Sequence, residues 1–229
     1  MTKTKRYQNI IYPYKKAEIL IEYNLPEKPS DLTLILGHGR NSDMYMPLYE
    51  YLAKKLPEEN VNFVRYNFPF VDNPRNRIKQ KKCVESYKAI MDDFHHELPQ
   101  NKFLFVGGKS FGALMSSRYK NNKATGFVFL SYPLNLPFMK ISLSRKALFE
   151  IKRPMLFVSG TEDRYTDRGK LELLMGALNP HAHLMLIPNT GHSLELQSVD
   201  KRNQEDLNME ISDILLWFMS DVIEKKMKK

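Results

Sequence analysis

Residues 103–112 constrain the fold of this chain more than any other stretch, because a run of apolar residues breaks there into Gly-x-Ser-x-Gly. The motif runs from Gly108 through Ser110 to Gly112, and a helix-like segment follows over residues 113–120. This pattern is typical of a nucleophile elbow, a strained strand-to-helix turn that holds a serine hydroxyl clear of the backbone. The two glycines relieve crowding at such a turn because neither carries a Cβ. We therefore predict a buried strand, a sharp turn and a helix.

The same stretch contains Gly-Lys-Ser, a sequence that also occurs in phosphate-binding loops. A Walker loop needs a second glycine five residues before the glycine that precedes the lysine. Phe103 occupies that position. The pattern therefore argues against a loop that cradles nucleotide phosphates.

A serine hydroxyl is a weak nucleophile by itself and needs a histidine base and an acid that orients the histidine. After an elbow of this type the acid comes first along the chain and the histidine second. Residues 154–159 read as a later strand, and a polar loop follows over residues 160–164. We predict Asp163 as the acid, with Glu162 and Asp167 left open as alternatives.

The histidine is expected after one further strand. Residues 183–187 are apolar and strand-like, and the turn residues of segment 188–193 end this run. His192 lies there between Gly191 and Ser193. We predict that it takes the serine proton and returns it to the leaving group. Serine, acid and histidine then stand in the required order, each at the carboxyl end of a predicted strand.

Acyl transfer also needs a place for the oxyanion. Residues 32–36 form an early apolar strand, and the loop 37–43 follows it. With an elbow of this type, one backbone N–H comes from the residue after the serine and another from such an early loop. We predict the N–H groups of Phe111 and Arg40. We interpret His38, in the same loop, as a structural residue and not as a second base.

With these residues assembled, the chain resembles the α/β-hydrolase superfamily over most of its length. It is most similar to small serine hydrolases related to dienelactone hydrolases and to the testis-expressed and chromatin-complex α/β-hydrolase-like proteins. The matching segments are residues 37–39, 64–69, 107–112, 131–134, 160–163 and 191–194.

The resemblance implies Ser110 as nucleophile, Asp163 as acid and His192 as base, but it implies no substrate. Dienelactone hydrolases proper use a cysteine where this chain has Ser110, so their lactone substrate is not carried over. Arg40 stands where related proteins often have a small residue, and it could bring a cation to the mouth of the site.

Strand-like and helix-like segments alternate along most of the chain. Two entry strands, residues 6–12 and 17–23, are expected to pair antiparallel around a turn at residues 13–16. Later strands are expected near Leu32, Val61, Phe103, Thr125, Met155 and His183, and helices over residues 44–56, 78–98, 111–120, 168–178 and 205–226. Alternation of this kind predicts an α/β fold with a mostly parallel central sheet and helices on both faces. The predicted site residues fall at the carboxyl ends of the strands, where sites in such sheets lie.

The length of 229 residues suits one α/β domain, and no linker, low-complexity run or repeat interrupts it. We therefore expect a single domain over residues 1–229. Only about twenty residues separate Tyr132 from Pro154, too few for a large lid, so we expect a minimal one. Residues 144–150 read as a helix that could form a small rim.

The formal net charge is +9. The positive residues concentrate in segments 3–6, 75–82 and 225–229, and no nucleic-acid-binding motif accompanies them. We expect a small-molecule partner and no nucleic acid, with segment 75–82 as the cluster that could attract an anionic substrate. Apolar residues at helical spacing in segment 205–226 are assigned to packing on the sheet and not to a membrane or partner.

Cys83 is the only cysteine, so no intramolecular disulfide can form, and we expect an ordinary packed thiol. Neither the pair His95 and His96 nor the pair His181 and His183 has the spacing and acidic partners of a zinc site. We expect no metal and no cofactor. No apolar signal segment or run of about eighteen apolar residues is found, which favours the cytoplasm.

The sequence thus predicts a serine hydrolase that cleaves carboxylic esters or thioesters of small to medium acyl groups through an acyl-enzyme on Ser110. Two alternatives stay open. One is a hydrolase-like binding or scaffold protein with little turnover, because fold does not fix function. The other is an acyltransferase that uses an acceptor other than water. The oligomeric state is open as well.

Overall fold

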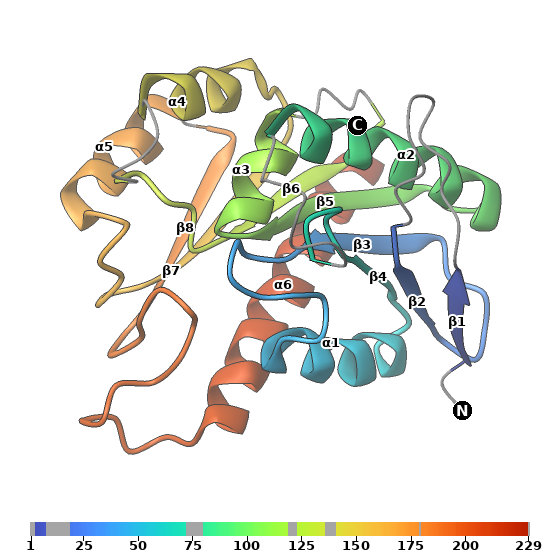
Figure 1. Cartoon of the computed structure of the whole chain (residues 1–229), viewed down its shortest axis with the longest axis horizontal. Coiled ribbons are helices and arrows are strands. Elements are labelled where there is room, and N and C mark those ends of the chain that lie inside the picture. Colours follow the sequence, from blue (N-terminus) through green and yellow to red (C-terminus); the bar gives the residue numbers. More distant parts are fainter. Residues whose placement is uncertain are drawn as a thin grey trace.

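A mixed β-sheet forms the centre of the molecule (Figure 1). The computed structural model describes residues 3–7, 19–71, 80–118, 123–135, 141–178 and 180–228. Within them, eight strands follow the order β1-β2-β4-β3-β5-β6-β7-β8. Their bounds are Lys3–Tyr7 (β1), Ile21–Leu25 (β2), Leu32–Gly37 (β3), Asn62–Tyr66 (β4), Phe103–Lys109 (β5), Gly126–Leu130 (β6), Met155–Gly160 (β7) and Ala182–Ile187 (β8).

The sheet is mostly parallel, as predicted. Strands β3 to β8 pair parallel with one another, whereas β2 pairs antiparallel with both β1 and β4. The predicted bounds of the entry strands were wrong: β1 already begins at Lys3, and β2 runs from Ile21 to Leu25. Pairing with β4, a strand distant in sequence, carries β2 beyond its predicted end. Residues 8–18, which include the predicted turn, lie outside the described residues.

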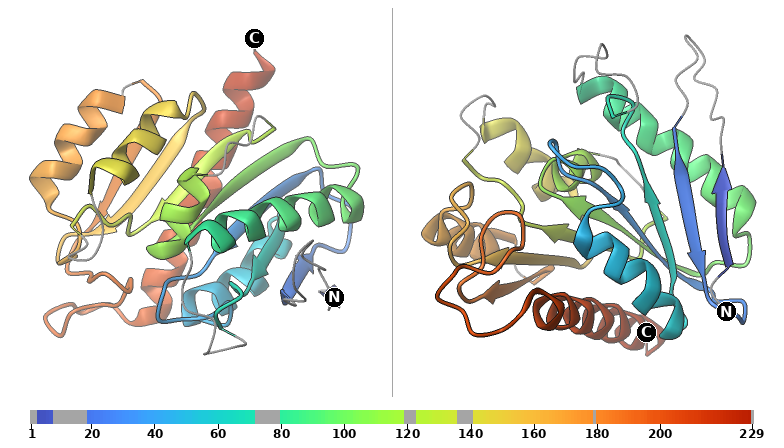
Figure 2. Two further views of the ribbon diagram at one scale, coloured as in Figure 1. Left: turned by 45° about the horizontal axis from the view of Figure 1, so that its top comes forward. Right: turned by 60° about the horizontal axis from the view of Figure 1, so that its bottom comes forward.

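Helices cover both faces of the sheet (Figure 2). One face packs against α2, α3, α4 and α5, and the other against α1 and α6. The bounds are Pro47–Glu58 (α1), Gln80–Glu97 (α2), Phe111–Arg118 (α3), Ile141–Glu150 (α4), Arg168–Leu178 (α5) and Gln204–Met227 (α6). Successive strand residues point to opposite faces, so the central strands are apolar throughout. In β5, for example, Phe105 packs with α6 residues and Val106 with those of α2 and α3.

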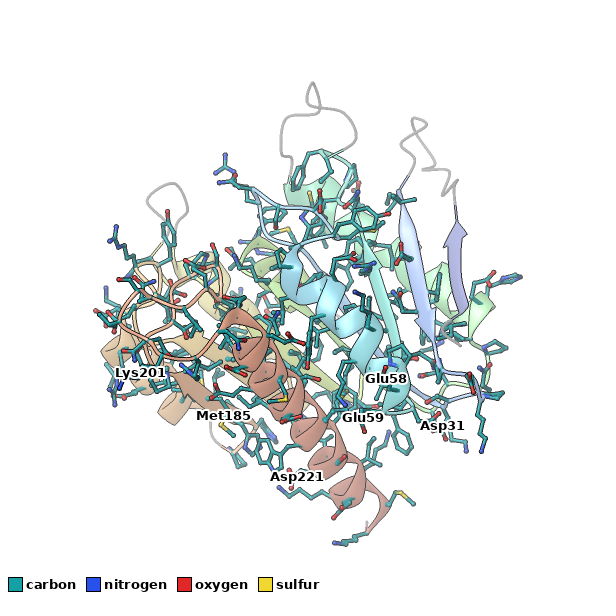
Figure 3. All side chains as sticks on the ribbon, turned by 90° about the horizontal axis from the view of Figure 1, so that it is seen from below. Asp31, Glu58, Glu59, Met185, Lys201 and Asp221 are labelled. Atoms are coloured by element: carbon teal, nitrogen blue, oxygen red, sulfur yellow. The ribbon has the colours of Figure 1, made fainter. Side chains whose placement is uncertain are left out.

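The last helix, α6, packs on the sheet, as predicted. A capping box begins it: the Asn203 side chain accepts from the Asp206 N–H, and the Asp206 side chain accepts from the Asn203 N–H. Its buried stripe comprises Leu207, Asn208, Ile211, Ser212, Leu215, Phe218, Met219 and Val222. Trp217 lies on its outer side with 45% of its surface exposed. Figure 3 views this face, with Glu58 and Glu59 at the end of α1 and Asp221 on α6.

Cys83 is a free thiol buried in α2, and burial raises its pKa to about 12. None of the helices in the described part of the chain combines the length and the apolar character that a membrane span requires.

Candidate active site

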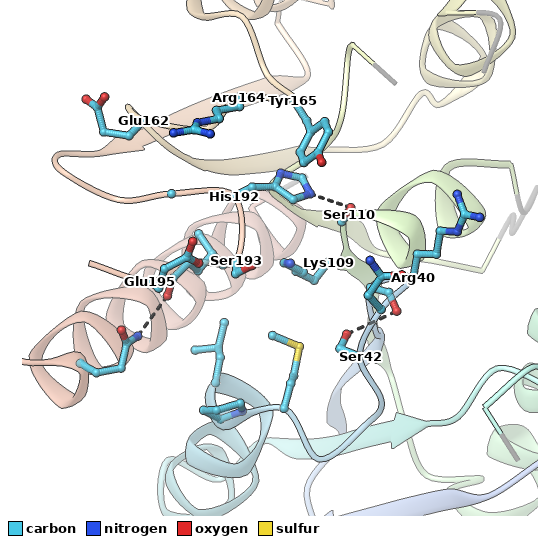
Figure 4. A pocket seen from close by; sticks show the side chains of 18 of the residues that line it. Arg40, Ser42, Lys109, Ser110, Glu162, Arg164, Tyr165, His192, Ser193 and Glu195 are labelled. Carbon is cyan, nitrogen blue, oxygen red and sulfur yellow. Dashed lines mark hydrogen bonds between the residues drawn. The ribbon is translucent and has the colours of Figure 1, made fainter. Parts of the chain in front are cut away.

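Four loops meet at the carboxyl edge of the parallel strands and line one pocket of about 1080 Å³ (Figure 4). They follow β3, β5, β7 and β8. Parallel strands bring their carboxyl ends to the same edge, which explains why segments distant in sequence converge here. Each predicted site residue lies in or directly beside one of these loops.

The elbow has the strained geometry that its sequence predicts. Ser110 lies between β5 and α3 with a φ of 53°, in the left-handed region that residues with a Cβ rarely adopt. Its N–H donates to the Leu130 carbonyl oxygen at 2.8 Å, and its own carbonyl accepts from the Leu114 N–H at 3.1 Å. A Cβ on either Gly108 or Gly112 would collide with the carbonyl oxygen of Gly37. The two glycines therefore allow the elbow to pack directly against the end of β3.

Ser110, His192 and Asp163 form a continuous hydrogen-bonded relay. Nε2 of His192 lies 2.8 Å from Oγ of Ser110, and Nδ1 lies 2.8 Å from both carboxylate oxygens of Asp163. An ionised carboxylate only accepts hydrogen bonds, so the ring proton belongs on Nδ1. Nε2 is then free to accept the serine proton.

The surroundings of Asp163 suit an orienting carboxylate. Its side chain is fully buried, and Oδ1 accepts from the Tyr165 N–H at 2.8 Å. The Thr166 hydroxyl lies 3.2 Å from Oδ2. Glu162, by contrast, is exposed beside the Thr161 hydroxyl, and Asp167 accepts from the Lys170 N–H in the first turn of α5. Among the three candidates, Asp163 is the one hydrogen-bonded to His192.

The loop that carries His192 is held by its own backbone and by the acid loop. His192 lies in a tight turn, because the Leu194 N–H donates to the Gly191 carbonyl at 3.1 Å. The Glu162 N–H donates to the Thr190 carbonyl at 3.0 Å. This bond ties the loop after β7 to the loop after β8 and so sets the spacing of Asp163 and His192. The Tyr165 ring packs edge-on against the His192 ring with 4.6 Å between centroids.

His38 fixes the early loop from within. Its ring is fully buried, and Nε2 accepts from the Phe68 N–H at 3.0 Å. The ring proton must therefore lie on Nδ1, which donates to the Gly39 carbonyl at 2.6 Å. Burial lowers the pKa of His38 from 6.5 to about 4, so the ring is neutral near pH 7. The geometry agrees with the predicted structural role.

This arrangement also orients the N–H of Arg40. The Gly39 carbonyl accepts from the His38 ring and lies 3.4 Å from N and 3.3 Å from Oγ of Ser42. A trans peptide places its carbonyl and its N–H on opposite sides. The Arg40 N–H therefore points away from the His38 ring, while Arg40 itself lines the pocket. Phe111 is the first residue of α3 and is 6% exposed.

Charged side chains of both signs line the pocket. Arg40 and Arg164 are exposed cations at its rim, and Glu162 and Glu195 are exposed carboxylates. Lys109 is different, because only 7% of its surface is exposed although it lines the same cavity. Burial lowers the pKa of its ammonium group, an effect that the charges of Glu195 and Asp163 oppose.

Lys109 and Tyr165 are two of the pocket residues to which the sequence interpretation gave no role. Lys109 was considered only as part of a phosphate loop. Its position directly before the elbow serine was the available signal, whereas nothing in the sequence sets Tyr165 apart. The basic segment 75–82 cannot be placed at the site, because residues 75–79 and the side chains of residues 80–82 lie outside the described residues. In the described part of the chain, no group of three or more His, Cys, Asp or Glu side chains could hold a metal ion.

The fold and the elbow define an α/β hydrolase. A family model described as an alpha/beta hydrolase domain matches residues 30–220, and the chain belongs to this family. The fold predicted from the sequence, with helices on both faces of the sheet and a minimal lid, is confirmed.

Solved structures share the fold at low sequence identity. An α/β serine hydrolase without lid from Xanthomonas campestris is 18% identical with a TM-score of 0.73, over 94% of this chain and 95% of that chain. Dienelactone hydrolase from Anabaena variabilis is 16% identical with a TM-score of 0.72, over 96% and 98%. An esterase from Pyrococcus furiosus is 17% identical with a TM-score of 0.72, over 95% and 94%.

Proposed function

We propose that this protein is a serine hydrolase that cleaves carboxylic ester or thioester bonds of small to medium acyl substrates. The observation that carries the proposal is the relay from Ser110 through His192 to the buried Asp163, with both links at 2.8 Å. The relay opens into a cavity of about 1080 Å³, which is large enough for substrates of this size. Similarity in fold to a serine hydrolase and an esterase adds support.

In the first half of the proposed cycle, Oγ of Ser110 attacks the substrate carbonyl carbon while its proton passes to Nε2 of His192. Asp163 stabilises the imidazolium that results. The oxyanion accepts hydrogen bonds from the N–H groups of Phe111 and Arg40. Collapse of the tetrahedral intermediate breaks the bond to the leaving group, which takes the proton from His192, and an acyl-enzyme remains.

In the second half, water replaces the leaving group. His192 takes a proton from the water that attacks the acyl carbonyl carbon, and the new oxyanion accepts hydrogen bonds from the same two N–H groups. Collapse breaks the acyl bond to Ser110, which regains its proton from His192. The products are a carboxylic acid and an alcohol or thiol.

A cytoplasmic location and a small-molecule partner belong to the same proposal. Cys83, the only cysteine in the sequence, is a buried free thiol, which is compatible with a reducing compartment. The pocket at the strand ends suits a small ligand.

Covalent labelling tests the proposal. A fluorophosphonate probe is expected to label the purified protein at Ser110, as mapped by mass spectrometry, and the protein should turn over p-nitrophenyl esters of short and medium acyl chains. Ser110→Ala is expected to abolish labelling and turnover while it keeps the fold. Absence of labelling in folded wild-type protein would instead favour a binding protein without turnover. Added alcohols that yield new esters would indicate an acyltransferase.

A further inference from the structure

Lys109 is a buried cation that lines the pocket. It ends β5 directly before Ser110, and only 7% of its surface is exposed. Among the residues that the structure describes, none forms a hydrogen bond or an ion pair with its Nζ. Burying an ammonium group without a partner is unfavourable, because the group loses its hydration. Lysine at position 109 therefore lowers the stability of the fold relative to an apolar side chain of the same length.

The Lys109 side chain lies against the loop that follows β3. A Cβ on Gly39 would lie 3.4 Å from Cδ of Lys109 and 3.7 Å from Nζ. These are ordinary contact distances, so the lysine chain and its ammonium group lie beside the loop that carries Arg40. In Figure 4 the Lys109 side chain lies in the pocket, with Arg40 on one side and Ser193 and Glu195 on the other.

The charges around Lys109 indicate what kind of ligand would bind its ammonium group. Arg40 and Arg164 add positive charge at the rim of the pocket. The negative charge of Glu195 favours the charged form of Lys109, but the two side chains form no ion pair in the described part of the chain. One ammonium group matches one carboxylate. A phosphate dianion would need more donors than one ammonium group offers, and the nearby Glu195 and Asp163 carboxylates would repel it more strongly than a monoanion. A monoanionic carboxylate is therefore the ligand that fits best.

We propose that Lys109 binds a carboxylate of the substrate, so that the enzyme prefers esters or thioesters that bear an acid group on the acyl chain, such as monoesters of dicarboxylic acids. This inference rests on the proposed function, because the reacting carbonyl is taken to lie at Ser110. Lys109 directly precedes Ser110 in the sequence, and both residues line the same cavity, so the proposal places the acid group and the reacting carbonyl of one substrate in this cavity.

The first test compares two p-nitrophenyl esters with six-carbon acyl chains, the anionic hydrogen adipate and the neutral hexanoate. Lys109→Met keeps the length of the side chain and removes the charge. It is expected to lower the ratio of the two kcat/KM values, adipate over hexanoate, by about 10- to 100-fold, the usual range for a lost hydrogen bond to a charged group. Ser110→Ala provides the blank for spontaneous hydrolysis.

A matched control lies directly before the same strand. Lys102 precedes β5 at the end opposite to Lys109, and its exposed side chain pairs with Asp31 at 3.1 Å. Lys102→Met is expected to leave the adipate-to-hexanoate ratio unchanged. An unchanged ratio in Lys109→Met would overturn the proposal. If the ratio stayed unchanged because both kcat/KM values fell equally, Lys109 would instead be assigned to oxyanion stabilisation or to the fold.

A second test measures binding without turnover and separates the failure of this inference from the failure of the proposed function. In the Ser110→Ala variant, monomethyl adipate, a monoanion, is expected to raise the thermal midpoint of unfolding more than the neutral dimethyl adipate does. Adding Lys109→Met is expected to abolish the difference. Should the wild-type protein hydrolyse no ester at all, this measurement still decides the role of Lys109. Equal shifts for the two ligands in Ser110→Ala would refute it.

Discussion

The loops after β3 and after β8 each carry a histidine, and the two rings have opposite surroundings. His38 is fully buried, and both of its ring nitrogens bond to backbone groups. The side chain of His192 is 17% exposed and faces the pocket, with Nδ1 on Asp163 and Nε2 on Ser110.

The comparison shows how a fold distinguishes a structural histidine from one available for proton transfer. The Phe68 N–H that occupies Nε2 of His38 can only donate, so protonation of His38 would break that bond. The Ser110 hydroxyl on Nε2 of His192 can give up its proton. Each histidine lies in a loop that follows a parallel strand of the sheet, but the partner of Nε2 differs.

The largest effect is expected from a mutation that disturbs His192. Asp163→Asn keeps the shape of the side chain but removes the charge and favours the wrong ring tautomer, so we expect kcat for p-nitrophenyl esters to fall by about 10⁴. Glu162→Gln, an exposed neighbour in the same loop, is the matched control and should retain kcat within about twofold. If Glu162→Gln caused the large loss instead, the acid would be misassigned.

The next largest effect is expected from a mutation of His38. His38→Ala removes the donor to the Gly39 carbonyl and leaves the buried Phe68 N–H without an acceptor. We expect the free energy of unfolding to fall by about 2–4 kcal/mol. We also expect kcat to fall by up to about 10²–10³, the usual cost of losing one oxyanion donor, because the Arg40 N–H is no longer held in place.

His38→Asn sharpens the same comparison. Its amide can still donate to the Gly39 carbonyl from the position of Nδ1, but it cannot reach the Phe68 N–H. We therefore expect His38→Asn to recover much of kcat while it remains destabilised, as measured by steady-state kinetics and urea unfolding. Equal losses of kcat in the Ala and Asn variants would show that His38 does not act through the Gly39 peptide.

Much of this site could be predicted from the sequence, because its parts are local. Gly108, Ser110 and Gly112 define the elbow within five residues, and a strand break followed by turn residues identifies the loop of His192. The central strands were found for the same reason, since burial on both faces makes each of them a continuous apolar run.

The parts that could not be predicted depend on contacts between distant segments. The acid is identified by the contact of Asp163 with His192, which lie in two loops that a bond from the Glu162 N–H to the Thr190 carbonyl joins. The burial of Lys109 depends on the loop at Gly39. Neither contact leaves a pattern in the sequence near the residue that it affects. The bounds of β2 were wrong for a similar reason, because they depend on its pairing with β1 and with the distant strand β4.

The smallest expected effect is a dependence of stability on pH that arises from His38 and not from the site. The pKa of His38 is about 4 in the folded protein, against 6.5 for the ordinary side chain, because burial disfavours the charged ring. Between these values the unfolded chain binds a proton that the folded chain does not. The free energy of unfolding therefore falls as the pH falls from 6.5 to about 4, by roughly 3 kcal/mol in all.

His38→Gln isolates this contribution, because its amide oxygen can accept from the Phe68 N–H and does not titrate. Urea unfolding of both proteins at pH 7 and at pH 4.5 gives the comparison, and the carboxylates common to the two proteins cancel in the difference. We expect the wild-type protein to lose roughly 2–3 kcal/mol more than His38→Gln between these two values. Parallel losses would mean that the folded protein protonates His38 without opening the loop after β3, and the structural reading of this histidine would then be wrong.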